Sequence, residues 1–352
     1  MLCEDRMSIF SKKQYDFIAI GDTVTDAFIK LKEAEVHCDV NKENCTICMR
    51  FGDKIPYEDV FVVPAVGNSA NAAVSATRLG LKSALVSNLG DDYFGKECLD
   101  VFVAEKVGTE FIKVHKGIKT NYHYVLWYDA DRTILVKHEE FPYEMPDIGE
   151  PKWMYLSSLG GNSGEFHGVI ERYLAAHPDI QLAFQPGTYQ MKLGREKLAA
   201  IYRRAEAFFC NKEEAQRILE TGEEDVKKLM QGIAGLGPKI VAITDGVKGA
   251  YAYDGRGPSV ISGQNSRGEF WFITLYPDPK PPLQRTGAGD AFSSAFTVAL
   301  ALGKSVPEAL SWGPINSMSV VQGIGARHGL LTRPQLEKYL AEAPAGYKAQ
   351  EL

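Results

Sequence analysis

The sequence predicts an α/β fold: a doubly wound, mainly parallel β-sheet with helices on both faces, plus a small β-lid. Two observations support this prediction. Short and almost continuous apolar runs, typical of buried parallel strands, alternate along the chain with longer segments of helical periodicity. Two other segments interrupt the alternation, and their composition is more polar or richer in β-forming residues.

The predicted strands and helices follow one another from residue 16 to residue 341. The runs typical of buried strands are 16–21, 83–88, 153–157, 180–184, 207–210 and 239–244. The segments with helical periodicity are 68–79, 93–106, 165–176, 212–220, 289–302, 306–322 and 333–341. Because parallel strands need long crossover connections, we expect these helices to cover both faces of one sheet.

We expect the lid to consist of residues 30–62 and 119–138, inserted into a single domain that spans residues 1–352. The second segment contains two β-rich runs around Asp129, Ala130 and Asp131, which is typical of a hairpin. Open strand edges invite pairing with another chain. A homodimer formed through the lid is therefore one predicted assembly.

Composition and charge exclude several classes of protein. With 45% hydrophobic and 24% charged residues the chain resembles ordinary globular proteins, and its net charge of −6 argues against a broad nucleic-acid surface. No apolar run approaches the roughly 18 residues that cross a bilayer, and the N-terminus lacks the apolar core of a secretory signal. These features predict a cytoplasmic protein with no membrane partner. In that compartment we expect reduced thiols or metal ligands at Cys3, Cys38, Cys45, Cys48, Cys98 and Cys210.

Four potential metal ligands lie between positions 37 and 48: His37, Cys38, Cys45 and Cys48. The C-x₂-C spacing of the last two can chelate zinc, and His37 or Cys38 would complete a tetrahedral set. A structural Zn²⁺ in the lid is one interpretation, and a group of reduced thiols is the other. A catalytic metal is not expected there, because the segment is distant in sequence from the phosphate motif described next.

Residues 285–292 read RTGAGDAF and precede a helical pattern. Gly287 and Gly289 allow the backbone to approach a ligand closely, and a helix start offers unpaired N–H groups and a positive dipole end. We therefore predict an anion site at the backbone of Gly287, Ala288 and Gly289, suited to a phosphoryl group. Asp290, beside these amides, is the candidate general base that accepts the proton of an attacking hydroxyl. An aspartate after a glycine turn is also a common helix cap.

The segment TGAGDAF at 286–292 resembles the signature of the ribokinase-like (PfkB) carbohydrate kinase family. Further similar motifs follow the family order: GDTVTD at 21–26, GNSAN at 67–71, LGDDYFG at 89–95, NKEE at 211–214, and TDG at 244–246 with Gly249. The resemblance extends over about residues 15–340. It implies an enzyme that transfers a phosphoryl group from ATP to an alcohol group, with Mg²⁺ as cofactor.

The resemblance also implies roles for individual residues. Those expected to contact the substrate are Asp26, Gly67, Asn68, Asn71 and Asn121. Those expected to contact the nucleotide are Asn211, Glu214, Thr244, Gly246, Gly249, Thr286, Asn316 and Gly325. Magnesium is expected to be bound through water near Glu214.

Two positions depart from the family pattern. Val66 replaces the first of two glycines at the hinge, which predicts a stiffer lid or a narrower sugar site. Gln284 replaces an acidic residue that helps relatives to bind a monovalent cation, so the sequence leaves dependence on potassium open.

The acceptor remains open at this point. The lid segments offer polar and basic side chains (Lys30, Lys32, Asn44, Arg50) and aromatic ones (Phe51, Tyr57, Tyr122, Tyr124, Trp127). A small sugar is favoured, followed by a nucleoside, whose base needs an aromatic or apolar slot, and by a sugar phosphate. A non-catalytic sugar or nucleotide sensor on the same fold is the alternative from another class. A dinucleotide-dependent dehydrogenase is not favoured, because no G-x-G-x-x-G follows the first strand.

Overall fold

The computed structural model describes residues 14–38, 45–129, 131–256 and 268–352. Its main sheet has ten strands in the order β16-β15-β14-β13-β12-β11-β10-β1-β6-β7. In chain order these strands are β1 (Phe17–Ile20), β6 (Ser83–Gly90), β7 (Ile112–His115), β10 (Trp153–Leu156), β11 (Gln181–Phe184), β12 (Ala205–Asn211), β13 (Ile240–Thr244), β14 (Ala250–Asp254), β15 (Glu269–Ile273) and β16 (Gln350–Glu351). From β7 to β13 neighbouring strands run parallel, and β14, β15 and β16 extend the edge antiparallel. The predicted α/β fold with a mainly parallel sheet is confirmed.

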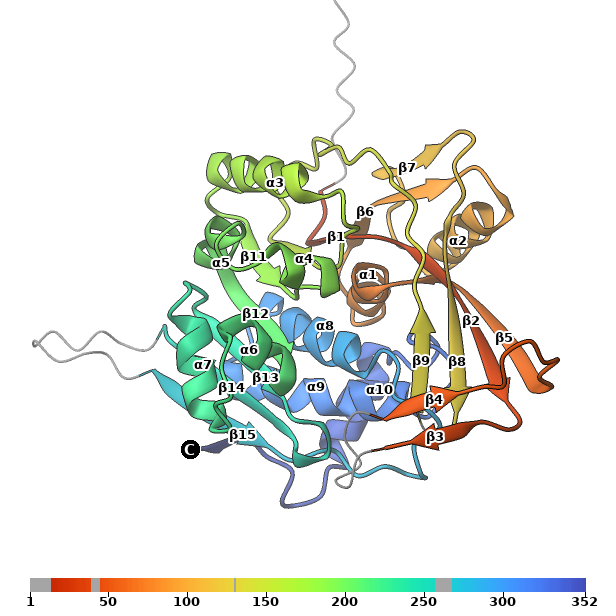
Figure 1. Cartoon of the computed structure of the whole chain (residues 1–352). Helices are drawn as coiled ribbons and strands as arrows, with labels where there is room; N and C mark the ends of the chain where they lie inside the picture. The colour runs from red at the N-terminus through yellow and green to blue at the C-terminus, as the bar shows by residue number, and fades with distance from the viewer. Residues whose placement is uncertain (1–13, 39–44, 130, 257–267) are drawn as a thin grey trace, which may run out of the picture.

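Helices cover both faces of this sheet, as predicted (Figure 1). One face packs against α1 (Asn68–Arg78), α2 (Tyr93–Ala104), α8 (Ala288–Ala301), α9 (Val306–Val320) and α10 (Arg333–Ala341). The other packs against α3 (Gly164–Ala176), α4 (Thr188–Leu193), α5 (Ala199–Arg204), α6 (Lys212–Leu219) and α7 (Val226–Ala234). In β1 the alternation of side chains sends Phe17 and Ala19 into the first core and Ile18 and Ile20 into the second. Strands buried on both faces must be apolar throughout, which explains the continuous runs in the sequence.

A four-stranded sheet forms the lid beside the main sheet, in the order β5-β2-β8-β9 (Figure 1). Its strands are β2 (Val24–Leu31), β5 (Tyr57–Val66), β8 (Asn121–Tyr128) and β9 (Asp131–Leu135). The predicted hairpin at 119–138 is present as β8 and β9, whereas the first lid segment begins at Val24, before the expected residue 30. On the inner face Val24, Phe28, Val63, Val66 and Val125 form a small core of their own.

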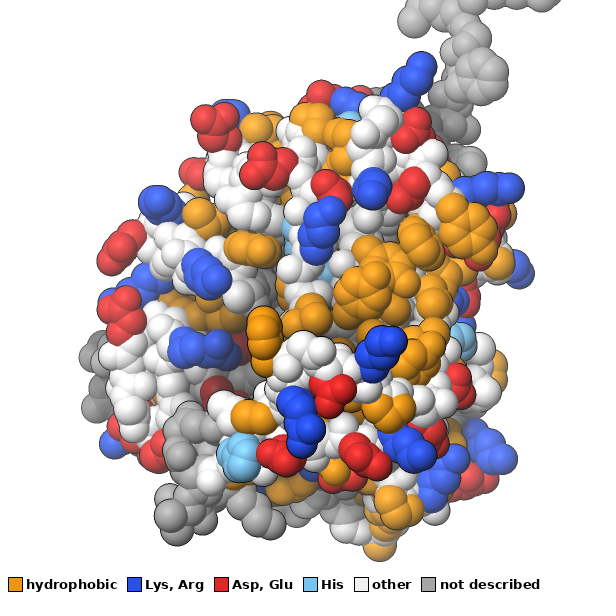
Figure 2. All heavy atoms as spheres, turned by 45° about the vertical axis from the view of Figure 1, so that its right-hand side comes forward, with side chains coloured by type: hydrophobic (Ala, Val, Ile, Leu, Met, Phe, Trp, Pro, Cys, Tyr) orange, Lys and Arg blue, Asp and Glu red, His pale blue; other side chains and the backbone are white. Residues whose placement is uncertain are grey.

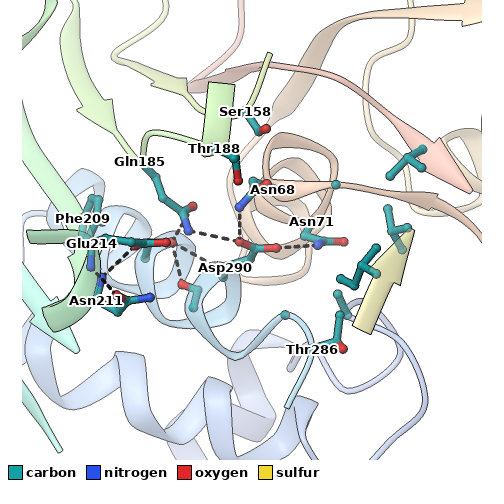
Figure 3. A pocket seen from close by; sticks show the side chains of 18 of the residues that line it. Asn68, Asn71, Ser158, Gln185, Thr188, Phe209, Asn211, Glu214, Thr286 and Asp290 are labelled. Atoms are coloured by element: carbon teal, nitrogen blue, oxygen red, sulfur yellow. Dashed lines mark hydrogen bonds between the residues drawn. The ribbon is translucent and has the colours of Figure 1, made fainter. Parts of the chain in front are cut away.

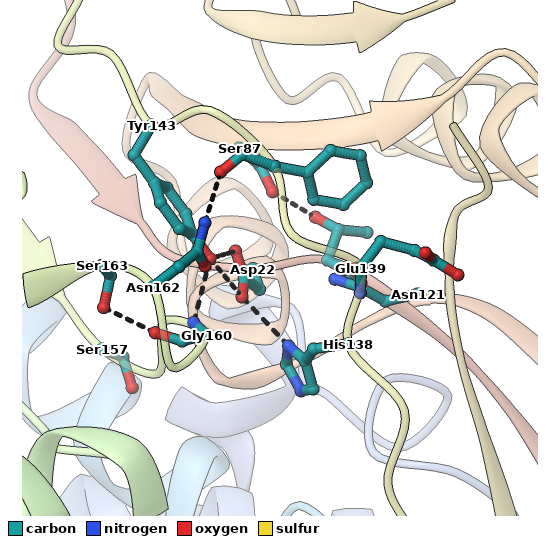
Figure 4. Close-up of polar contacts among 12 residues, drawn as sticks. Asp22, Ser87, Asn121, His138, Glu139, Tyr143, Ser157, Gly160, Asn162 and Ser163 are labelled. Carbon is teal, nitrogen blue, oxygen red and sulfur yellow. Dashed lines mark hydrogen bonds and ion pairs between the residues drawn. The ribbon is translucent and has the colours of Figure 1, made fainter. Parts of the chain in front are cut away.

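The chain that leaves the lid is fixed to the start of the lid by a buried polar cluster (Figure 4). The carboxylate of Asp22 accepts a hydrogen bond from the hydroxyl of Tyr143 at 2.9 Å and lies 3.1 Å from Nδ1 of His138. The amide of Gly160 donates to the same tyrosine hydroxyl at 2.9 Å. Burial and the nearby Asp22 carboxylate raise the pKa of Tyr143, so its hydroxyl remains a neutral donor.

Two cysteines of the lid differ from the prediction of reduced thiols. Strands β3 (Glu35–His37) and β4 (Thr46–Cys48) pair His37 with Thr46, which brings the next residues, Cys38 and Cys45, opposite one another as a disulfide. The expectation of reduced thiols or zinc ligands is therefore wrong for this pair.

The other cysteines within the described residues do not form a metal site. Cys48 is an exposed free thiol, Cys98 and Cys210 are buried free thiols, and Cys3 lies outside the described residues. In the described part of the chain no group of three histidine, cysteine or acidic side chains is placed to hold a metal ion. Among the same residues, none of the helices has the length and hydropathy needed to cross a membrane.

Candidate active site

A cavity of about 680 Å³ lies between the lid and the carboxyl ends of strands β11, β12 and β13 (Figure 3). Ligands of α/β proteins bind at this edge of the sheet, and the volume is in the range of small-molecule sites. The predicted residues that line it are Asp26, Gly67, Asn68, Asn71, Asn211, Glu214, Thr244, Thr286, Gly287, Gly289 and Asp290. The structure thus brings together motifs that lie more than two hundred residues apart in the sequence.

Asp290 is buried in the first turn of α8, and three side-chain amides hold its carboxylate (Figure 3). Asn68 donates to Oδ1 at 2.8 Å, Asn71 donates to Oδ2 at 2.8 Å, and Gln185 donates to Oδ1 at 3.1 Å. Asn68 and Asn71 come from the first turn of α1, where residues three apart share a helix face. Gln185 follows the last residue of β11.

The orientation of Gln185 is itself fixed by neighbouring hydroxyls. Tyr155 and Ser293 both donate to its Oε1, so its Nε2 is directed at Asp290. Burial raises the pKa of Tyr155 well above its ordinary value, and this phenol therefore stays protonated. A neutral and fixed amide at this position stabilises the ionised form of Asp290.

The pKa of Asp290 is raised above its ordinary value of 3.8, chiefly because burial disfavours the charged carboxylate. The amides of Asn71, Gln185 and Asn68 act in the opposite direction, and the nearby carboxylate of Asp26 raises the pKa further. The result is a carboxylate with increased proton affinity that still accepts hydrogen bonds. Such a group is suited to act as a general base.

The start of α8, next to Asp290, has the geometry predicted for an anion site. Gly287 caps the helix with φ 82°, and a Cβ atom there would lie 2.3 Å from Cβ of Ala326, so this position requires glycine. A Cβ atom at Gly289 would have Gln185 at 3.9 Å as its nearest neighbour, so this residue faces the open cavity. The helix has 14 residues, and its first N–H groups and dipole favour negative charge at this end.

Several buried polar atoms at the cavity lack a hydrogen-bond partner within the described residues. They are Oδ1 of Asp26, Oδ1 of Asn71, Nε2 of His123, Nε of Arg132 and Oγ1 of Thr286. Buried polar atoms in proteins are usually paired, and unpaired ones call for an explanation. All five atoms belong to residues that line one cavity, and a polar ligand bound there would pair with them.

The opposite end of the cavity contains Asn211 and Glu214. Their side chains and backbone amides form a reciprocal capping box, with Asn211 Oδ1 accepting from the amide of Glu214 at 2.7 Å and Glu214 Oε2 accepting from the amide of Asn211 at 2.9 Å. Burial raises the pKa of Glu214. One carboxylate fits a magnesium ion that keeps most of its waters and binds phosphate oxygens, but the described residues form no protein cage for a metal.

Six predicted residues are not at the cavity wall: Ala288, Asn121, Gly246, Gly249, Asn316 and Gly325. Gly246 and Gly249 shape the turn between β13 and β14, next to the cavity residue Thr244. Gly325, with φ 81°, packs against Val63 of the lid.

The two asparagines of this group have structural hydrogen bonds. Asn121 donates to the carbonyl of Thr23 at 3.1 Å and accepts from the amide of Glu139 at 2.8 Å, which joins the two ends of the lid. Asn316 is fully buried in α9, donates to the carbonyl of Ala291 at 3.0 Å and accepts from the amide of Leu331 at 3.0 Å.

The position that departs from the family pattern, Gln284, is buried below the anion site. Its Nε2 donates to the carbonyl oxygens of Gly323 at 3.0 Å and Thr286 at 3.3 Å, and its Oε1 accepts from the amide of Thr286. The neutral side-chain amide of Gln284 thus forms hydrogen bonds with backbone N–H and C=O groups at this position. The other departure, Val66, lines the cavity and belongs to the inner core of the lid.

Sequence reasoning missed the cavity residues Gln185, His123, His138, Arg132 and Tyr189. Gln185 could have been found from its position directly after a predicted strand, because ligands of α/β proteins bind at the carboxyl ends of the strands. In the lid, residues 132, 134, 136 and 138 all face the cavity, a period of two that is typical of one face of a strand.

The lid residues that were expected from the sequence to contact the acceptor do not lie at the cavity. None of the described ones lines the cavity, and Asn44 lies outside the described residues. Lys30, for example, pairs with Glu58 at 2.6 Å at an exposed position.

Comparisons with known proteins agree with this geometry. Residues 25–333 match the profile of the pfkB family carbohydrate kinases. The chain is 24% identical over 338 residues to the ATP-dependent 6-phosphofructokinase of Thermoanaerobacterium thermosaccharolyticum, covering 90% of this chain and 91% of that one. It is 29% identical over 268 residues to the cytidine kinase of Thermococcus kodakarensis, covering 74% and 88%.

Solved structures show the same fold. The ribokinase of Arabidopsis thaliana, complexed with ribose and ATP, has a TM-score of 0.72 at 19% sequence identity, covering 93% of this chain and 99% of that one. The family profile spans most of the chain and includes the segment around Asp290. The chain therefore belongs to the pfkB family of ATP-dependent carbohydrate kinases.

Proposed function

We propose that the protein transfers the γ-phosphoryl group of ATP to a hydroxyl of a small sugar, with Asp290 as the general base. The observation that carries this proposal is the environment of Asp290, whose carboxylate is buried beside a helix N-terminus and held by three amides. The acceptor hydroxyl would lie against this carboxylate and transfer its proton to Oδ1 or Oδ2. The backbone amides of Gly287, Ala288 and Gly289 would hold the charge that develops on the phosphoryl group.

The nucleotide would occupy the side of the cavity formed by Asn211, Glu214 and Thr244, with its phosphates directed at the start of α8. Magnesium, when bound, would neutralise phosphate charge, and Glu214 would hold one of its waters. In this proposal the predicted residues Gly246, Gly249, Asn316 and Gly325 shape the surrounding loops and do not touch the reacting groups.

A sugar is favoured as acceptor because Asn71 Oδ1 and His123 Nε2 have no hydrogen-bond partner at the cavity, and Asp26, 3.4 Å from Nδ1 of His123, lines the same cavity. Carboxylate, amide and imidazole groups pair well with several hydroxyls of one small molecule. A nucleoside is the second candidate, since Ile134, Val136 and Tyr189 give the same cavity an apolar wall on which a base could stack.

We also propose a homodimer formed through the lid. Figure 2 shows hydrophobic side chains gathered on the side of the molecule that carries the lid. Strand register aligns Val62, Ala27, Tyr124 and Leu135 in one row across the four strands, on the face opposite to Asp26 and His123. Val62 and Tyr124 are 48% and 49% exposed, and a second copy of this face would cover them.

The kinase proposal is tested by measuring ADP release with D-ribose, D-fructose, fructose 6-phosphate, cytidine and adenosine as acceptors. Turnover of one of them is expected, and Asp290→Asn should reduce kcat by at least about a hundredfold, the scale of a lost general base. Near-normal turnover in this variant would contradict the role of Asp290. Tight binding of a sugar without any turnover would instead favour the non-catalytic sensor.

A further inference from the structure

We propose that the side-chain amide of Gln284 holds the backbone of the proposed anion site in place, so that this site needs no monovalent cation. Gln284 is then a positioning residue, which acts through Thr286 and the start of α8. The inference rests on the proposed function and deepens it, because it assigns what keeps the proposed anion site in shape. It predicts that a carboxylate at position 284 creates a requirement for K⁺ or Na⁺ that the wild type lacks.

Gln284 is buried, with 1% of its surface exposed, and connects two segments of backbone below the start of α8. Its Oε1 accepts a hydrogen bond from the amide of Thr286, and its Nε2 donates to the carbonyl oxygens of Thr286 at 3.3 Å and Gly323 at 3.0 Å. Backbone pairing supports this connection, since the amide of Leu283 donates to the carbonyl of Val321 at 2.8 Å. The side chain thus fixes the chain before α8 to the chain after α9.

Both segments lead directly to the proposed anion site. Thr286 precedes Gly287, which caps α8 (Figure 3). The chain after Gly323 reaches Ala326, which lines the cavity and whose Cβ would lie 2.3 Å from a Cβ atom added at Gly287. A shift of either segment therefore moves the first amides of α8, and a misplacement of about 1 Å near the reacting groups can cost about a hundredfold in rate.

The groups around Gln284 do not fit a monovalent cation. Carbonyl oxygens bind such an ion by replacing its hydration shell, but those of Thr286 and Gly323 already accept hydrogen bonds from Nε2. The amide is neutral, so it supplies no charge to balance an ion. Its own donors and acceptor are also used, because the two N–H groups have two carbonyl partners and the oxygen has the amide of Thr286.

A carboxylate at this position would reverse the interaction. Glutamate has the length of glutamine but no N–H group, so a carboxylate oxygen would face the carbonyl oxygens of Thr286 and Gly323. A buried charge without a partner is strongly unfavourable. A monovalent cation would remove the conflict, because it binds carboxylate and carbonyl oxygens together. Gln284→Glu should therefore exchange the hydrogen bonds for a cation, whereas Gln284→Met removes them and creates no cation site.

The kinetic test compares the wild type with Gln284→Glu, Gln284→Met and the control Gln231→Glu, which adds the same charge on the exposed surface of α7. Each protein is assayed with the acceptor found in the screen, Mg²⁺, and ATP free of K⁺ and Na⁺. The salts are KCl, NaCl and choline chloride at one ionic strength, since choline is too large to bind between the buried oxygens.

Because equal ionic strength keeps screening constant, kcat of the wild type and of Gln231→Glu should change less than about twofold among the salts. In Gln284→Glu, kcat should fall at least about tenfold in choline chloride and recover in KCl or NaCl. Gln284→Met should lose a similar factor in all three salts, with little change in acceptor KM. Recovery that depends on the cation separates positioning from a general loss of stability.

A second measurement does not need an acceptor. The melting temperature of Gln284→Glu should be about 2 °C or more higher in KCl or NaCl than in choline chloride, because an ion that binds only the folded state stabilises it. The wild type, Gln284→Met and Gln231→Glu should show no such difference.

Three results would overturn the proposal: a wild type that K⁺ activates severalfold, full activity of Gln284→Glu in choline chloride, or a loss in this variant that neither cation reverses. If Gln284→Glu does not fold, the salt dependence of the wild type and the kcat of Gln284→Met decide instead. If the wild type phosphorylates no acceptor, the proposed function fails, while the melting temperatures still decide the role of Gln284.

Discussion

The burial of Asp290 in the cavity predicts how kcat depends on pH. The proposed base must be ionised, and burial raises the pKa of Asp290, so we expect activity to be present above the raised pKa and lost as pH falls through it. Gln185→Met removes one donor that stabilises the ionised form. The pKa should then rise further, and the acid limb of kcat should move to higher pH.

The measurement is kcat against pH for the wild type and Gln185→Met, with Gln231→Met on the exposed surface of α7 as the control. A wild-type limb below the ordinary aspartate value of 3.8 would contradict the raised pKa. A limb that moves to lower pH in Gln185→Met would contradict the role assigned to this amide.

Single residues of the site were predictable where one local motif contains them. Gly287, Gly289 and Asp290 lie within four positions, and the chemistry of a glycine turn before a helix does not depend on the rest of the chain. Asn316 and Asn121 were not predictable in the same way. Their amides pair with backbone groups far away in sequence, and only the folded chain shows these hydrogen bonds.

At the level of elements, the two glycines at the start of α8 are expected to differ in role. Gly287 is required by the backbone structure, whereas Gly289 leaves space for the proposed anion site. Gly287→Ala would place a methyl group 2.3 Å from Ala326 at a positive φ, so we expect a loss of stability of about 2 kcal/mol or more. Gly289→Ala meets open space and normal helical geometry, where alanine stabilises a helix by about 0.5–1 kcal/mol. Its methyl group would nevertheless occupy the anion site and should lower kcat at least about tenfold.

Thermal unfolding and kcat of the two variants check this prediction together. The expected pattern is a lower melting temperature for Gly287→Ala and an unchanged or higher one for Gly289→Ala with reduced activity. Full activity in Gly289→Ala would show that the transferring group does not approach this part of the backbone.

Strands were predictable where burial on both faces required a continuous apolar run, as in β1 and β13. Strands β14 and β15 were missed because both contain partly exposed side chains and lack a continuous buried run, and because antiparallel pairing with their neighbours fixes them. The disulfide between Cys38 and Cys45 was missed because thiols were expected to stay reduced in a cytoplasmic protein. It depends on the register of β3 and β4, which the polar sequence of this ribbon does not specify.

On the scale of the whole molecule, the two faces of the lid differ: one lies over the cavity, and the other carries apolar side chains and points away from it. The inner face carries Asp26, His123 and Arg132 over the cavity, and the outer face carries the row of Val62, Tyr124 and Leu135. Since side chains alternate along a strand, residues that serve the site require neighbours that point away from it. The lid was predicted from the sequence, but its aromatic and basic residues were expected to contact the acceptor. Composition alone does not distinguish the two faces of the lid.

An apolar outer face predicts that the lid is also the surface of assembly. If two lids pack face to face, light scattering after size-exclusion chromatography should give a dimer mass for the wild type and a monomer mass for Val62→Asp and Tyr124→Asp, because an unpaired carboxylate is costly to bury. Val247→Asp is the matched control, since this valine is equally apolar and 78% exposed but lies in the turn after β13. A wild-type monomer at high protein concentration, or a dimer that survives both lid substitutions, would contradict the proposed interface.

Because each lid also carries Arg132 and Asp26 on its inner face, dimerisation would restrain the same sheet that must close over the acceptor. The monomeric variants should therefore show a raised acceptor KM.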